Sequence, residues 1–138
     1  MSRSRRIRVV WAIIAVCVFY VAGIFARWQY GALIIIRNAS GHTVRDAAVK
    51  VERVGKKYDL GELAPGKQSR VFVEIAGESN VNLEFVDAQN QRHVATVIGY
   101  VEKGYCGRGN ATILPSGDAD SRDTTTLDPC WRSWRDFF

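Results

Sequence analysis

The chain has 138 residues, a formal net charge of +5 and aromatic side chains at 11% of positions, a size that suits one small domain. Four of the positive charges are arginines within the first eight residues, so the rest of the chain carries only +1. That remainder mixes both signs along its length, a pattern that does not indicate a nucleic-acid-binding protein.

The N-terminal segment predicts a membrane anchor. Residues 9–26 are eighteen uncharged, mostly apolar residues. They follow a basic segment, residues 1–8, whose arginines are Arg3, Arg5, Arg6 and Arg8. A helix of eighteen residues is about 27 Å long, close to the hydrocarbon thickness of a bilayer, and arginines before it favour a cytoplasmic N-terminus. We therefore expect a signal-anchor helix in the bacterial cytoplasmic (inner) membrane, with the C-terminal domain in the periplasm.

Two other interpretations of this segment remain open, a cleaved signal peptide and a lipoprotein signal. The apolar run is longer than a usual signal core and contains the bulky Trp11. Residues 21–23 form a mediocre cleavage site, and Val16 before Cys17 is poorly suited to lipoprotein processing. A short tether, residues 27–31, holds side chains typical of a membrane interface, namely Arg27, Trp28 and Tyr30. The anchor is favoured, and an exported soluble domain is the alternative.

Residues 32–116 predict a small antiparallel β-sandwich, immunoglobulin-like or related. Apolar and polar residues alternate with the period of two that marks half-buried strands, and turns such as Pro65-Gly66 separate the runs. Phe72 breaks the alternation on the polar face of its strand, which indicates either a contact surface or an imperfect pattern. Strands are expected at residues 32–37, 47–52, 58–61, 70–75, 81–85, 91–98 and 109–114. Inward side chains are expected at Ile34, Ile36, Val49, Val51, Leu60, Leu63, Val71, Val73, Ile75, Val81, Leu83, Phe85, Val94 and Ile113.

The first two hairpins are similar to those of known sandwich domains. The string Ile36-Arg37-Asn38-Ala39-Ser40-Gly41, then residues 49–54, then Leu60-Gly61-Glu62-Leu63-Ala64-Pro65-Gly66 resembles the opening hairpins of many small bacterial envelope sandwich domains. The resemblance covers residues 33–75. It implies a sandwich fold and no activity.

Cys106 and Cys130 are the cysteines outside the predicted anchor, on the side expected to be oxidising. A structural disulfide between them is favoured, and it would close a loop containing a polar connector, residues 117–127. Loop-closure entropy for such a bridge is about 3 kcal/mol. A redox pair or a metal site that recruits His42 and His93 is the alternative.

Aromatic side chains gather in two places near the C-terminus. Residues 128–138 predict a short helix or tail, and residues 99–109 are rich in both glycine and tyrosine. These aromatic residues would contact the membrane interface, a partner protein or the domain's own sandwich. The candidate contact residues are Tyr100, Tyr105, Trp131, Trp134, Phe137 and Phe138.

Catalytic signals are missing from the sequence. The chain has two histidines, neither in a recognisable motif, and its carboxylates follow no spacing typical of general acid–base catalysis. We expect a non-catalytic accessory subunit or protein-binding module of an integral membrane protein complex, in contact with the lipid bilayer, without cofactor, metal, nucleic acid or small-molecule substrate. The alternative is a periplasmic assembly or metal-delivery factor that uses Cys106, Cys130 and a histidine.

Overall fold

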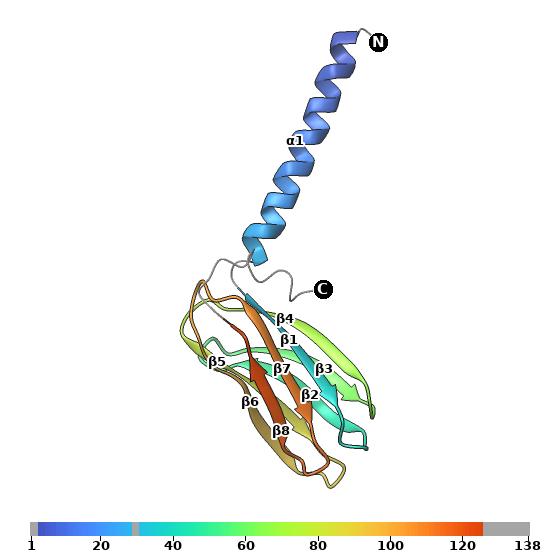
Figure 1. The fold of residues 1–138 in the computed structure, drawn as a ribbon, viewed down its shortest axis with the longest axis vertical. Coiled ribbons are helices and arrows are strands. Elements are labelled where there is room, and N and C mark those ends of the chain that lie inside the picture. Colours follow the sequence, from blue (N-terminus) through green and yellow to red (C-terminus); the bar gives the residue numbers. More distant parts are fainter. Residues whose placement is uncertain (1–2, 29–30, 126–138) are drawn as a thin grey trace.

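The computed structural model describes residues 3–28 and 31–125, and within the helix it describes the side chains of residues 7–23 (Figure 1). One helix, α1 (Arg3–Trp28), is followed by eight strands. These strands are β1 (Gly31–Asn38), β2 (Val44–Val51), β3 (Lys56–Leu63), β4 (Gln68–Glu74), β5 (Ser79–Val86), β6 (Arg92–Val101), β7 (Gly107–Ile113) and β8 (Ala119–Asp123).

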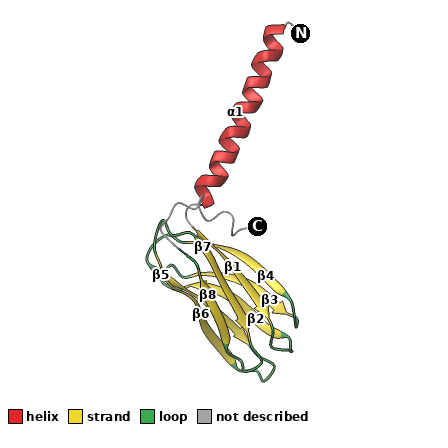
Figure 2. Ribbon diagram, in the orientation of Figure 1, coloured by secondary structure: helices red, strands yellow, loops and turns green. Residues whose placement is uncertain are grey.

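Helix α1 projects from one end of the strand-built domain (Figure 2). It includes the apolar run of residues 9–26 and also Arg27 and Trp28, which we expected in the tether. Over the residues that the structure describes, no helix is both long enough and apolar enough to cross a membrane.

The strands form two four-stranded sheets, with orders β4-β1-β7-β8 and β3-β2-β5-β6. The prediction of a small β-sandwich is therefore confirmed at this level. One pairing differs from the expected antiparallel pattern, because β1 and β7 are parallel while β1 and β4 are antiparallel. Strand β1 thus lies inside its sheet, and both β1 and β7 start at the end of the domain next to α1, here called the helix-proximal end (Figure 1).

The core fills the space between the two sheets. Side chains alternate along β1, where Ala32, Ile34 and Ile36 are completely buried. Most of the expected inward positions are buried, and Leu60 and Val71 are partly buried against the same cluster. The core also contains residues that the sequence analysis did not name, namely Ala32, Val44, Ala47, Val97, Ile98, Val101 and Ala111.

Val94 was wrongly predicted to point inward, since it is 60% exposed. Its strand partner is Glu84, whereas buried Phe85 is paired with His93. The pairing of β5 with β6 is irregular farther along, and the consecutive residues Val97 and Ile98 are both buried there. This irregularity changes the inward phase within one strand, so a strict period of two fails.

Two segments contain more strand than the sequence indicated. The expected polar connector, residues 117–127, contains β8, an edge strand with no fully buried residue. The glycine-rich stretch of residues 99–109 supplies the end of β6 and the start of β7. Neither segment shows apolar alternation in the sequence. Strand β8 is an exposed edge strand and needs no buried apolar residues, and β7 is built largely on small residues.

Asn38, at the end of β1, ties together the turns at the end of the domain away from α1, here called the distal end. Its buried Nδ2 donates to the carbonyls of His42 and Leu63, both at 2.7 Å. Its Oδ1 accepts hydrogen bonds from the backbone N–H and the hydroxyl of Ser40. The predicted Pro65-Gly66 turn is confirmed by the Lys67 N–H bond to the Ala64 carbonyl and the φ of +75° at Gly66.

We predict that Asn38→Ala lowers the free energy of unfolding by about 3 kcal/mol, because the Leu63 carbonyl loses this buried donor and the N–H and hydroxyl of Ser40 lose their acceptor. Urea unfolding of the full chain in detergent, followed by the circular dichroism signal of the strands, measures the change. The control is Gln91→Ala, which removes an exposed amide from another turn and should change stability by less than about 0.5 kcal/mol. Equal effects of the two variants would contradict this role for Asn38.

Candidate functional site

The surface of α1 is the first candidate site. Every side chain described in the helix is exposed, including Arg8. The exposed fraction is 66% for Trp11 and 79% for Phe19, and even Ile14, the least exposed of its large apolar residues, reaches 45%. Arg3, Arg5, Arg6, Arg27 and Trp28 lie on the helix, but their side chains, like all of Tyr30, lie outside the described residues.

The second candidate site is the helix-proximal end of the sandwich. Tyr100 and Tyr105 pack edge to face with ring centroids 6.0 Å apart, so the two predicted contact residues do lie together. Tyr105 also packs against the core, while Tyr100 is 50% exposed and donates a hydrogen bond to Glu102 at 3.2 Å. Partial desolvation, followed by this hydrogen bond and the charge of Glu102, raises the pKa of Tyr100, which therefore remains a neutral phenol at pH 7.

Cys106 lies at the same end, just before β7, and its side chain is completely buried. It is disulfide-bonded, whereas Cys17 on α1 is a free, exposed thiol. The predicted partner, Cys130, lies outside the described residues, so the pairing stays a prediction. The predicted contact residues Trp131, Trp134, Phe137 and Phe138 also lie outside the described residues.

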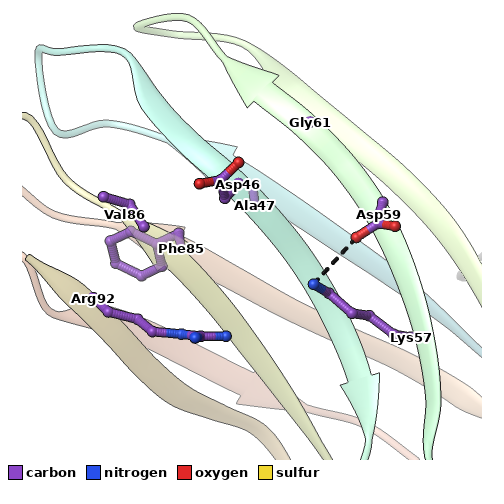
Figure 3. Close-up of a pocket in the computed structure, with 8 residues that line it drawn as sticks. All are labelled: Asp46, Ala47, Lys57, Asp59, Gly61, Phe85, Val86 and Arg92. Atoms are coloured by element: carbon purple, nitrogen blue, oxygen red, sulfur yellow. Dashed lines mark ion pairs between the residues drawn. The ribbon is translucent and has the colours of Figure 1, made fainter. Parts of the chain in front are cut away.

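A cavity of about 380 Å³ opens beside an irregularity in the pairing of β2 with β3 (Figure 3). Asp46 takes a positive φ of 49° there, and Gly61 opposite takes 70°. The ring of Phe85 borders the cavity, and Lys57 pairs with Asp59 at 3.4 Å across one side. The lining residues are Asp46, Ala47, Lys57, Asp59, Gly61, Phe85, Val86 and Arg92. This lining combines two carboxylates, two cations and an aromatic edge.

The histidines lie in different surroundings. His42 is exposed in the first turn of the distal end. His93 stacks on Phe85 with ring centroids 5.1 Å apart, and its Nε2 lies 2.7 Å from the Asp87 carboxylate. Among the described residues, no group of three or more histidine, cysteine, aspartate or glutamate side chains could hold a metal ion.

The cavity beside Asp46 and the contact between His93 and Asp87 were not predicted from the sequence. The irregular pairing at residues 44–48 does not alter the apolar pattern of the sequence. Gly61, a glycine inside an expected strand, was the one available signal of an irregularity there. The second contact depends on His93 facing inward, which the phase error at Val94 concealed.

Asp87 makes the stability of the fold depend on pH. The hydrogen bond from His93, and then the backbone N–H of Gln91, lower the pKa of Asp87. A carboxylate whose pKa is lower in the folded state stabilises the fold above its unfolded pKa of about 3.9, and this contribution is lost as the pH falls through the folded value.

We predict that Asp87→Asn lowers the Tm at pH 7 and that its difference from the wild type shrinks as the pH falls below about 4. Thermal unfolding followed by circular dichroism between pH 7 and pH 2 measures both effects. Asp120→Asn, on an exposed residue of β8, controls for the loss of one negative charge. A Tm difference that is independent of pH would contradict the proposed role of the Asp87 carboxylate.

Comparison with known proteins assigns no family to the chain. No protein family matches the sequence, and neither does any curated protein. A protein from Eubacterium rectale, whose structure was determined by NMR, aligns with a TM-score of 0.47 and 12% sequence identity. The alignment covers 68% of this chain and 88% of that chain. A likeness of this size carries no argument about the fold or the function of the present chain.

Proposed function

We propose that the chain is a single-pass membrane protein of the bacterial cytoplasmic membrane, whose periplasmic β-sandwich serves a membrane complex as a non-catalytic accessory subunit or protein-binding module. The exposed apolar surface of α1 is the observation that carries this proposal. Leaving so many large apolar side chains in water is unfavourable by about 25 cal/mol per Å². Lipid, or lipid together with neighbouring helices, would cover them.

The dimensions of α1 support an anchor. The 26 residues of the helix correspond to about 39 Å, and the apolar run of residues 9–26 to about 27 Å of it. The described side chains end at Gly23, and the proposal also takes in the apolar residues Ile24, Phe25 and Ala26 that follow in the sequence. The N-terminal arginines supply the charge asymmetry for a cytoplasmic N-terminus.

The connection between α1 and β1 supports a domain held close to the membrane. Helix α1 ends at Trp28 and β1 begins at Gly31, so only residues 29–30 separate them. The tyrosine pair and Cys106 are at the helix-proximal end, where this short connection would hold them near the headgroups. A bridge from Cys106 to Cys130 would attach the aromatic tail at the same level.

A position this close to the bilayer suits contact with another membrane protein. Tyr100 is half exposed, and tyrosine supplies a large contact area at low cost in conformational entropy. Its partner in this arrangement is the part of an integral membrane complex that rises just above the bilayer.

We predict that Val16→Arg combined with Val18→Arg releases the chain from membranes, because two arginines near the middle of a spanning helix cost about 6 kcal/mol. The fraction of chain in the pellet after alkaline carbonate extraction measures the effect. Val16→Leu combined with Val18→Leu is the matched control and should pellet like the wild type. A wild-type chain found in the supernatant, or one whose N-terminal sequence begins after residue 23, would contradict the anchor.

We also predict that the wild-type chain, extracted in a mild detergent, elutes in a complex whose other members include an integral membrane protein. Tyr100→Ser should reduce the share of chain in that complex, because it removes an exposed aromatic contact at the membrane-proximal level. Val94→Ser removes a similarly exposed apolar side chain from the outer face of β6 and serves as the control. Elution as a monomer without a co-purifying partner would contradict the proposed function.

A further inference from the structure

The outer face of the sheet β4-β1-β7-β8 carries four arginines. Because Ala32, Ile34 and Ile36 point into the core, Leu33, Ile35 and Arg37 point out from β1. Residues paired across strands share a face, and the register pairs Ile35 with Arg70, Leu33 with Arg108 and Asn110 with Arg122. We call this surface the arginine face, and define it by Leu33, Ile35, Arg37, Arg70, Arg108 and Arg122.

The guanidinium groups of the arginine face have no acidic partners within the described part of the chain. The ion pairs found there involve none of these four arginines. The Nε–H of Arg108 is a buried donor without a hydrogen-bond partner, and such unsatisfied buried groups are unusual in folded proteins. The acidic residues on the same side of the sheet are Asp120 and Glu74, and Glu74 is paired with Lys56 of β3.

The outer face of the other sheet is different, because its charges compensate one another. Glu84 lies 2.7 Å from the guanidinium of Arg92 and 3.8 Å from the ammonium of Lys50. Lys57 pairs with Asp59, and Lys50 also pairs with Glu52 at 3.0 Å. A partner would have to break these pairs to use this face, whereas the arginine face has cations available.

Apolar side chains lie among the arginines. Leu33 and Ile35 are only partly buried at the middle of the sheet. Phe72, which departs from the alternation in β4, is paired with Leu33 on the same face. Its phenyl ring packs over Gly31 so closely that a Cβ atom at this position would collide with it. Arginine beside aromatic and aliphatic groups is the composition typical of the centre of a protein interface.

We propose that the arginine face docks a carboxylate-rich segment of a neighbouring protein, with apolar side chains of that segment on Leu33 and Ile35. Guanidinium groups bind carboxylates through paired N–H donors, and this fit favours aspartate and glutamate. Strands β1 and β7 run away from α1 and strands β4 and β8 run back toward it, so the face lies along the side of the domain and not at its helix-proximal end (Figure 1). This inference rests on the proposed function, because it names the chemistry of the partner that an accessory subunit would bind.

The test uses the full chain in discs of zwitterionic lipid and, as probe, a fluorescein-labelled peptide that repeats Glu-Leu-Glu-Ser. We expect saturable binding by fluorescence anisotropy, weakened by salt, and no binding of a peptide that repeats Lys-Leu-Lys-Ser. Arg37→Ser, Arg70→Ser and Arg122→Ser together should raise the Kd about tenfold, since three exposed charge contacts are lost.

The matched control combines Arg45→Ser, Lys57→Ser and Arg92→Ser, which removes the same net charge from the outer face of the other sheet. It should change the Kd less than about threefold, because only the long-range field is altered. Equal losses in the two triple variants, or the absence of saturable binding to the wild type, would overturn the proposal.

A photo-crosslinking residue at Ile35, with Thr96 on the other sheet as control, separates this inference from the proposed function. In native membranes we expect crosslinks from Ile35 to a protein segment rich in aspartate and glutamate, and few from Thr96. If the native complex forms but Ile35 crosslinks only lipid or nothing, the proposed function stands and the arginine face is excluded as its docking surface. If no complex forms and the peptide still binds, the proposed function fails while the arginine face keeps its specificity for carboxylates.

Discussion

Strand β1 fixes the position of the rest of the domain. It follows α1 after residues 29–30 only, and it is hydrogen-bonded on both sides, to β4 and to β7. Its inward residues lie in the core, its outward residues lie at the middle of the arginine face, and its last residue, Asn38, joins the distal turns. Because the connection of two residues leads directly into a strand that is held on both sides, the domain cannot move far from the end of the helix without unfolding.

The chemical contrast between the two sheet faces gives this arrangement a functional meaning. One outer face has carboxylates between its cations, as in Lys50, Glu84 and Arg92, and presents a self-compensated surface. The other leaves its arginines unpaired around Leu33 and Ile35, in the described part of the chain. The chain therefore has two surfaces that are poorly solvated by water alone. The apolar surface of α1 suits lipid, and the arginine face suits an acidic protein.

The sequence was informative where a strand keeps one buried and one exposed face in regular alternation. Strand β1 and the Pro65-Gly66 turn could be predicted because alternation and turn chemistry act locally. Val94 could not, since its orientation depends on irregular pairing with a distant strand. Strand β8 could not, since an exposed edge strand needs no apolar residues. For the sites, the deviation at Phe72 was visible in the sequence, but the gathering of Arg37, Arg70, Arg108 and Arg122 depends on sheet order and register.

Cys17 allows a direct test of whether α1 lies in lipid and holds the sandwich beside the membrane, because it is a free thiol on the exposed surface of the helix. A membrane-impermeant maleimide should fail to label Cys17 in intact membranes and should label it after solubilisation in SDS, because the reactive thiolate does not form in hydrocarbon. Thr96→Cys, on the outer face of β6, should be labelled when the outer side of the membrane is accessible. Equal labelling of Cys17 before and after solubilisation would show that α1 does not lie in lipid.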